Sequence, residues 1–381
     1  MLLRTCLLLL ALLAPLCSRA EAMYVVTLLP DGFQPADINN RGQIAGALYA
    51  SSGGVHAALF ADGVVTDLGT TVSSDSYANA VNDAGAIAGN FGGVAGPEHA
   101  FLYRDGKVTD IVAGTALGMN AAGDVVGQRY SAAGAAGFLY HDGVLTEPGY
   151  LGMGNISRAM AINDAGQVVG ESNLAADEQA PTRPYLYDSG TLIDLGTLAD
   201  RGVNNAVVIN NAGQIAGYSD AGNGRMHVFF HEHGVMTDLG SFGGFDVTIG
   251  GMNQRGQVVG TGNTVDGPDV AFISRAGALV DLNTLIDPGA GWTVTNAIDI
   301  NDGGQIIANA CRDFACTSVR LDLASAVPEP CSAWLLLPGL VAVAGIRRKQ
   351  AGRCRHRPVI EQAVRQRRHP RLVSDARSSP P

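Results

Sequence analysis

Three histidines, His227, His231 and His233, lie close enough in the sequence to be considered as metal ligands. Imidazole nitrogens bind zinc at such spacings, but a zinc site requires three or four ligands that converge on one point. His56 and His99 share with His227 one position of a repeat described below, and this recurrence indicates a role in the scaffold. The sequence therefore predicts neither a metal site nor a bound cofactor.

Aspartates are the second set of groups that could do chemistry, because they recur at one position of the same repeat. A pair of carboxylates can hydrolyse a glycosidic bond when the two groups lie ~5–10 Å apart. Residues that occur once per repeat are spread around the fold, so we expect these aspartates to make structural hydrogen bonds. A serine hydrolase would need a Gly-x-Ser-x-Gly nucleophile elbow, which the chain lacks, and we predict that the protein is not an enzyme. The recurring aspartates are Asp67, Asp110, Asp194, Asp238 and Asp281.

The element that positions these residues is a nine-residue phrase, Ile-Asn-Asp-Ala-Gly-Gln-Val-Val-Gly, which runs from Ile162 to Gly170. Seven copies occur, and the six steps from the first to the last Asn span 262 residues, so the period is about 44. Four-stranded propeller blades repeat every ~40–45 residues. The asparagines of the seven copies are Asn39, Asn82, Asn120, Asn163, Asn210, Asn253 and Asn301.

The residue types of the phrase are those of a tight turn between two strands. Asn bonds its own backbone two residues later, and Gly adopts the positive φ of a sharp reversal. The apolar residues on either side are strand positions. Calcium binding is the alternative, but an EF-hand-like loop ends on a Glu at its twelfth position, and the twelfth residue from Asn163 is Leu174. We therefore predict that the seven turns are structural.

Two further strand candidates follow each turn, for example residues 99–103, His-Ala-Phe-Leu-Tyr, and 63–69, Gly-Val-Val-Thr-Asp-Leu-Gly. With the strands before and after the turn, they give four strands per repeat. Pairs such as Val168-Val169 and triplets such as Phe101-Leu102-Tyr103 indicate strands that are buried on both faces. A propeller blade is covered by a neighbour on each side, which produces this pattern.

The strand that contains Thr-Asp-Leu occurs only six times inside the array, and a seventh copy, from Tyr24 to Leu29, precedes the first repeat. We expect this segment to pair antiparallel to residues 317–321 as the outer strand of the last blade, because an open ring would expose sheet edges. A linear array would need capping repeats, and none is recognisable. The predicted fold is all-β: a seven-bladed β-propeller of four-stranded antiparallel blades, closed by pairing of the N-terminal strand with the last blade.

The first 22 residues are typical of an export signal. Arg4 precedes an apolar core from Leu7 to Leu13, and Ala20-Glu21-Ala22 supplies small residues for cleavage. Of six cysteines, only Cys311 and Cys316 fall within the predicted propeller, and in an oxidising compartment they indicate a hairpin disulfide. A Cys-x4-Cys metal half-site is the alternative, but it has no second half.

The propeller is followed by Val327-Pro328-Glu329-Pro330, an apolar run from Trp334 to Ile346, and the basic cluster Arg347-Arg348-Lys349. As a helix, the residues from Cys331 to Ile346 would reach roughly 24 Å, which is short of the ~30 Å hydrocarbon core. This predicts a transient anchor in the inner membrane, with its basic end in the cytoplasm. The formal net charge is −10, and the residues before Arg347 carry −19, because the later ones hold eleven Lys or Arg and two acidic residues. An acidic body excludes nucleic acid as an expected partner.

This C-terminal segment resembles a PEP-CTERM sorting signal, on the order of its Val-Pro-Glu-Pro motif, its apolar run and its basic stop. The resemblance implies a Gram-negative host, processing by an exosortase, and an association with exopolysaccharide and biofilm systems. The repeats resemble the extracellular HAF repeat family over most of residues 24–323, with the motif literal at His99-Ala100-Phe101. The basic tail 350–381 departs from the sorting signal, which ends near its basic cluster.

The predicted organisation has four parts: a signal peptide (1–22), a HAF-repeat propeller (23–323), a linker and sorting signal (324–349), and a basic tail that is disordered or artefactual (350–381). The predicted function is that of an exported binding or structural protein of the cell surface or extracellular matrix, with an exosortase and extracellular polysaccharide as partners. The alternative is a polysaccharide-modifying hydrolase or lyase that acts at the propeller mouth.

Overall fold

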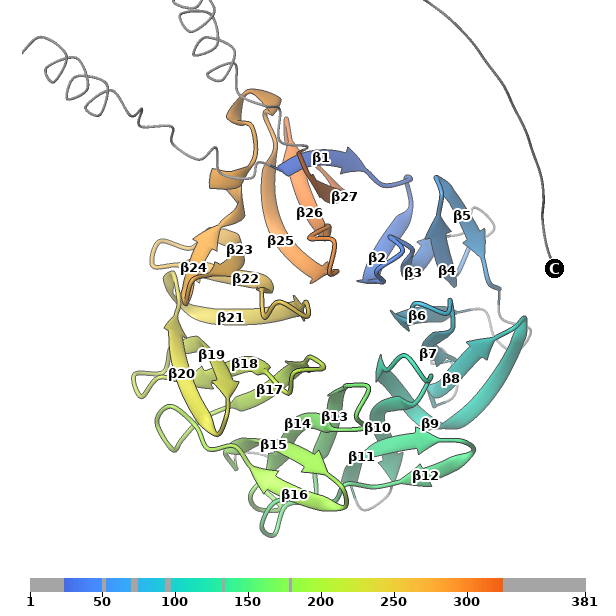
Figure 1. Ribbon diagram of the computed structural model, residues 1–381, viewed down its shortest axis with the longest axis vertical. Coiled ribbons are helices and arrows are strands. Elements are labelled where there is room, and N and C mark those ends of the chain that lie inside the picture. Colours follow the sequence, from blue (N-terminus) through green and yellow to red (C-terminus); the bar gives the residue numbers. More distant parts are fainter. Residues whose placement is uncertain are drawn as a thin grey trace, which may run out of the picture. The chain divides into compact units, whose positions relative to one another are not determined.

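In the computed structural model, the chain forms a ring of antiparallel β-sheets around a central axis (Figure 1). The structure describes residues 24–49, 53–69, 75–92, 97–131, 134–177 and 180–324. The predicted signal peptide, sorting signal and basic tail lie outside these residues. Within the described ranges, none of the helices has the length and apolar composition that a membrane span requires.

Five sheets are four-stranded, and in each of them consecutive strands pair antiparallel. The first contains β2 (Phe33–Ile38), β3 (Ile44–Tyr49), β4 (Val55–Ala61) and β5 (Val64–Asp67). The second contains β13 (Ser157–Ile162), β14 (Val168–Asn173), β15 (Thr182–Asp188) and β16 (Thr191–Asp194). The third contains β17 (Asn204–Ile209), β18 (Ile215–Asp220), β19 (Met226–Glu232) and β20 (Val235–Gly240). The fourth contains β21 (Gly243–Met252), β22 (Val258–Thr264), β23 (Asp269–Arg275) and β24 (Ala278–Asp281). The last contains β25 (Thr293–Ile300), β26 (Ile306–Arg312), β27 (Ala315–Leu323) and β1 (Tyr24–Leu28).

The remaining strands form one seven-stranded sheet in the order β12-β11-β10-β9-β8-β7-β6. Its members are β6 (Ser76–Val81), β7 (Ile87–Phe91), β8 (His99–Arg104), β9 (Lys107–Met119), β10 (Val125–Ser131), β11 (Gly134–His141) and β12 (Val144–Thr146). Two short 3₁₀ helices, η1 (Leu282–Leu285) and η2 (Pro288–Ala290), lie between β24 and β25.

The predicted seven-bladed architecture is therefore wrong: the propeller has five four-stranded antiparallel blades rather than seven. The difference arises at β9, which pairs with β8 through residues 107–113 and with β10 through residues 114–119. Successive turn asparagines are 43 to 48 residues apart elsewhere, but Asn82 and Asn120 are only 38 apart. The loop that separates an outer strand from the next inner strand is missing here, so one long strand serves both positions.

The ring closes through β1, as predicted for the N-terminal segment. This strand pairs antiparallel with β27, with Val26 opposite Leu321 and Leu28 opposite Val319. The amide of Leu29 continues the ladder by donating to the carbonyl of Ser318 at 3.1 Å. The first and last parts of the propeller are thus joined by backbone hydrogen bonds rather than by the covalent chain.

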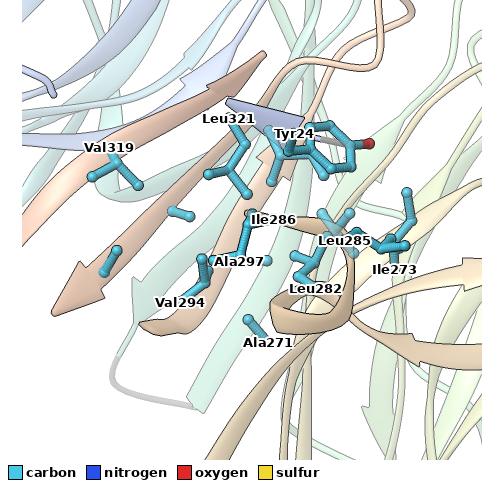
Figure 2. Packing of buried hydrophobic residues seen from close by; sticks show 14 of the residues in the cluster. Tyr24, Ala271, Ile273, Leu282, Leu285, Ile286, Val294, Ala297, Val319 and Leu321 are labelled. Carbon is cyan, nitrogen blue, oxygen red and sulfur yellow. The ribbon is translucent and has the colours of Figure 1, made fainter. Parts of the chain in front are cut away.

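Closure also buries an aromatic side chain. Tyr24 is 4% exposed and belongs to the same buried cluster as Leu321, Ile286 and Leu285. Figure 2 shows its ring beside Leu321, with the η1 side chains Leu282 and Leu285 in the same cluster. In contrast, Val25 alternates to the other face of β1 and is 55% exposed. Tyr24 and the partly buried Val26 therefore complete the hydrophobic core of the last sheet, whereas Leu28 on the same face is 56% exposed.

We expect Tyr24→Ala to destabilise the propeller by about 3 kcal/mol, because it empties a buried aromatic position. Removing the whole strand, in a chain that begins at Pro30, should lower the melting temperature further and promote oligomers, since the edge of β27 becomes free to pair. Thermal unfolding combined with light scattering measures both effects.

Val25→Ala is the matched control on the opposite face, and its effect should stay within about 0.5 kcal/mol. If the chain that begins at Pro30 remains monomeric with an unchanged melting temperature, β1 does not close the ring.

Candidate functional site

The turn of each repeat is fixed by its asparagine, as Asn163 illustrates. Its Oδ1 accepts from the backbone N–H groups of Ala165 at 3.1 Å and Gln167 at 3.0 Å. Its backbone carbonyl accepts from the N–H of Gly166, whose φ of +78° is available to glycine at little cost. The turn chemistry inferred from the phrase is thus the chemistry that the structure shows.

The same asparagine also bonds outside its own repeat, which the sequence analysis did not foresee. Asn163 Nδ2 donates to Gln167 Oε1 at 2.8 Å within the turn and to the carbonyl of Asn210 in the next repeat at 3.1 Å. All seven asparagines make this second bond, and each is at most 7% exposed. The bonds form a closed circuit: Asn39 to Asn82 (2.9 Å), Asn82 to Asn120 (3.2 Å), Asn120 to Asn163 (3.3 Å), Asn163 to Asn210 (3.1 Å), Asn210 to Asn253 (3.3 Å), Asn253 to Asn301 (3.4 Å) and Asn301 to Asn39 (3.0 Å).

The residues that follow the asparagines form a second ring closer to solvent, which we call the outer ring. In six of seven repeats, the side-chain oxygen of this residue accepts a hydrogen bond from the backbone N–H of the equivalent residue in the preceding repeat. For example, Asp302 accepts from the backbone N–H of Gln254 at 2.7 Å. The exception is Ala121, which has no side-chain acceptor. The outer-ring residues are Asn40, Asp83, Ala121, Asp164, Asn211, Gln254 and Asp302.

Both rings surround one mouth of a central cavity with a volume of about 530 Å³. The inner strands β2, β6, β9, β13, β17, β21 and β25 all contribute to its wall. Of the described residues that line the cavity, none is Lys, Arg or His. Its aspartates are Asp37, Asp83, Asp164, Asp299 and Asp302.

Arginines do occur near this mouth, but on the outer side of the turns. Arg255 Nη2 donates to the carbonyl of Asp302 at 2.6 Å, and Arg104 Nη2 donates to the carbonyl of Ala122 at 2.7 Å. Both guanidinium groups therefore bond backbone oxygens instead of the carboxylates. None of the described ion pairs joins an arginine to an aspartate of the cavity wall.

Two of the cavity carboxyls, Asp37 and Asp299, are hydrogen-bonded to each other. Asp37 also accepts from the backbone N–H of Val81 at 2.6 Å, and Asp299 accepts from that of Ile38 at 3.0 Å. The pair is closer than the ~5–10 Å spacing that glycosidases use, because those enzymes must fit a substrate between their carboxyls.

The two carboxyls resist ionisation. Burial raises the pKa of Asp37, although hydrogen bonds from Asp299, Val81 and Ile38 act in the other direction. Burial and the neighbouring Asp37 carboxyl raise the pKa of Asp299 well above its ordinary value. Like charges at hydrogen-bond distance cannot both be ionised without a large penalty.

The sequence contains a signal for this pair that we had not used. The residue two places before the turn asparagine is Asp only in the first and last copies, which become neighbours when the ring closes. The other five copies have small or apolar residues at this position: Ala80, Gly118, Ala161, Val208 and Gly251.

The recurring aspartates lie elsewhere, in the strands that pair with β4, β8, β15, β19 and β23 on the side away from the central axis. Asp67 accepts from His56 Nδ1 at 2.8 Å and also from the backbone N–H of Gly69. The same pairing joins His99 to Asp110 at 3.1 Å and His227 to Asp238 at 3.0 Å. Arg183 replaces the histidine beside Asp194, and Asp281 instead accepts from the amide of Asn283 at the start of η1. These aspartates make structural contacts and are not brought together.

The three candidate zinc ligands have different surroundings. His227 is occupied by Asp238, and burial lowers the pKa of His231. His233 occupies the β19–β20 turn with a φ of +53°. Among the residues that the structure describes, no three His, Cys, Asp or Glu side chains could hold a metal ion together.

Cys311 and Cys316 form a disulfide between β26 and β27, where they are directly opposite each other in register. The sorting-motif residues Val327, Pro328, Glu329, Pro330, Arg347, Arg348 and Lys349 lie outside the described residues.

We expect Asn163→Ala to destabilise the protein by about 2–4 kcal/mol, because four hydrogen bonds are lost and buried partners become unsatisfied. Chemical denaturation of the purified chain measures this loss. Asn223→Ala is the control, since Asn223 is an exposed turn residue that bonds only the amide of Arg225 among the described contacts. Equal effects of the two substitutions would contradict a special role for the ring.

No family model matches the chain, and no curated protein matches it either. Solved structures show the fold. The chain is similar to the β-propeller domain of the Trilobed protease from Pyrococcus furiosus, with 10% identity, 79% of this chain and 100% of that chain covered, and a TM-score of 0.53. That domain has an open velcro topology, whereas β1 pairs with β27 here.

A prolyl endopeptidase is similar with 10% identity, 80% and 51% of the two chains covered, and a TM-score of 0.50. TolB from Acinetobacter baumannii is similar with 13% identity, 77% and 65% covered, and a TM-score of 0.42. The chain thus spans less than two thirds of TolB and about half of the endopeptidase. At these identities the likeness shows a β-propeller and nothing about the reaction or ligand.

Proposed function

We propose that the protein is an exported binding protein that holds its ligand at the mouth formed by the asparagine turns. The observation that carries this proposal is the cavity of about 530 Å³, whose described lining has five aspartates and no cationic side chain. A concave site with a few fixed polar groups is the usual form of a ligand site.

Rigidity supports binding at this place. The oxygens of Asp164 and Asp302 are held by backbone N–H groups of neighbouring repeats at 2.9 and 2.7 Å. A ligand therefore meets acceptors that are already oriented, so that less conformational entropy is lost on binding. The second carboxylate oxygen of Asp164 also accepts from Asn211 Nδ2 at 2.6 Å, so this group is held on both sides.

The charge of the site selects the ligand class. Carboxylates and amide oxygens accept hydrogen bonds, and a negative cavity attracts cations through its electrostatic field. A protonated amine satisfies both requirements. Together with the expected exopolysaccharide association, this supports a polysaccharide that carries protonated amino groups.

Binding is favoured over catalysis. Propellers similar to this one occur in proteases, but at 10% identity they do not transfer an activity. The contact between Asp37 and Asp299 does not have the spacing of a glycosidase pair, so the geometry does not support the alternative of a polysaccharide hydrolase. A binding role requires only the preorganised mouth.

We also propose that the protein is exported and then sorted through residues 327–349, in the manner of a PEP-CTERM protein handled by an exosortase. The support is the order of the Val-Pro-Glu-Pro motif, the short apolar run and the basic stop. The disulfide between Cys311 and Cys316 is consistent with an oxidising compartment.

Oligomers of glucosamine and of N-acetylglucosamine distinguish the proposed ligand class, because they differ in the protonated amine. At mildly acidic pH and low salt, calorimetry should detect binding of the glucosamine oligomer and much weaker binding of the acetylated one. Salt should weaken the interaction, since part of it is screened. Replacing Asp83, Asp164 and Asp302 with Asn should reduce the affinity about tenfold, at up to about 1 kcal/mol per ion pair.

A matched control replaces Asp62, Asp105 and Asp142 with Asn. These residues lie in hairpin turns at positive φ, where Asn is tolerated, and the net charge changes by the same amount. Equal affinities of the two triple variants, or a preference for the acetylated oligomer, would show that the aspartates of the mouth do not select the ligand.

Intact-mass measurement tests the sorting proposal. Protein recovered from the surface of its native host should lack the segment from Trp334 to Lys349. Recovery of the full segment on the mature protein would contradict processing by an exosortase.

A further inference from the structure

The two carboxyls Asp37 and Asp299 lie on opposite sides of the junction where the ring closes. Asp37 belongs to β2 of the first repeat, and Asp299 belongs to β25 of the last. The last repeat is held to the first by the pairing of β27 with β1, which continues along the chain into β2. The pair therefore bridges the first and last repeats, whose junction depends on this non-covalent strand pairing rather than on a direct covalent link.

Each carboxyl also ties its repeat to the next one around the ring. Asp299 accepts from the N–H of Ile38 in the first repeat at 3.0 Å, and Asp37 accepts from the N–H of Val81 in the second at 2.6 Å. The two acids also contact each other, and each of them is close to a second backbone N–H group as well, that of Ile38 for Asp37 and that of Ile300 for Asp299.

A hydrogen bond between two carboxyl groups requires a proton, because an ionised carboxylate has only acceptors. A single proton between the two groups gives one donor and one acceptor, and it also halves their charge. Two ionised groups would repel each other at the closure of the ring.

We propose that Asp37 and Asp299 share one proton across the closure of the ring, and that loss of this proton at higher pH loosens the junction between the first and last repeats. The pair then acts as a pH-sensitive latch. Its operation does not require a ligand at the mouth.

The surroundings provide backbone N–H donors but no cationic partner for a second negative charge among the described residues of the cavity. The charged group that faces Asp37 from the neighbouring turn is Asp83, which raises the pKa of Asp37 further. On the side of β21, Asp299 lies against Gly251, where a Cβ would sit 1.7 Å from its Oδ1. Among the described residues that line the cavity beside the pair, no cationic side chain is present.

The direction of the pH effect follows from linkage. In the unfolded chain both carboxyls ionise near the ordinary value of about 3.9, whereas both pKa values are raised in the folded chain. Unfolding therefore releases protons at pH values between these limits, and the free energy of unfolding falls as pH rises through this window. The stabilisation that the pair contributes is fully present at pH values below the pKa of the unfolded chain. It is lost as the pH rises through the pKa of the folded chain.

Asp299→Asn tests the latch. Asn is nearly isosteric, it can donate from Nδ2 to Asp37 and accept from Ile38 at Oδ1, and it stays neutral at every pH. Thermal unfolding of the full chain is measured from about pH 4 to pH 9 in the presence of EDTA. The melting temperature of the wild type should fall relative to the variant by on the order of 2–4 °C per pH unit in the window, and the two should converge toward the acid end.

Asp164→Asn is the control, because it removes the same charge from the same cavity but not from the pair. Its melting curve should keep the wild-type dependence on pH that the pair produces. Parallel curves for the wild type and Asp299→Asn would overturn the proposal. So would stabilisation of the wild type alone by added calcium, which would show that the pair holds a cation.

Asp37→Asn gives an independent variant if Asp299→Asn does not fold. Carboxyl ¹³C chemical shifts of the wild type then decide directly. One of the two carboxyls should remain protonated well above the ordinary range for Asp, and amide exchange at Ile38 and Val81 should accelerate when it ionises. Titration of both carboxyls in the ordinary range would overturn the proposal.

Discussion

The closed circuit of seven asparagine amides is the interaction on which the rest of the propeller depends. Each side chain fixes its own turn with Oδ1 and binds the next repeat with Nδ2, so local and global order rest on one group. The ring bonds of 2.9–3.4 Å are all buried, and each links turns that are 38 to 48 residues apart, except the last, which spans 262. Because the circuit closes, every turn is bonded to both of its neighbours around the axis, whether or not their sheets are separate.

The sequence predicts the strands and turns well because both follow from short-range chemistry. Asx turns, glycine at positive φ and apolar pairs recur in every copy of the phrase, and β1 was identified as the missing outer strand. The number of separate blades was not predictable in the same way. It depends on whether a loop interrupts the strand that leaves one sheet and enters the next. The short step from Asn82 to Asn120 is the available sign that β9 continues through both.

The candidate site was predictable only in part. The role of Asn163 in its turn follows from the residues next to it in the sequence. Its bond to the carbonyl of Asn210 joins residues 47 positions apart, so local sequence patterns could not predict it. The His56–Asp67 pair likewise depends on strand register, although both residue types were noted as recurrent. Asp37 and Asp299 were visible as the two exceptions at one repeat position, but only ring closure shows that these exceptions meet.

The junction between the last and first repeats is held differently from the other junctions of the ring. Elsewhere, neighbouring repeats are tied by the chain as well as by the ring, so a local opening is held by a short covalent link. At the closure only non-covalent contacts act: the β1–β27 ladder, Tyr24 in its cluster, the Asn301–Asn39 bond and the carboxyl pair. The disulfide restrains the hairpin that receives β1. A circular repeat array should open first at this junction, so stabilising contacts have their largest effect there.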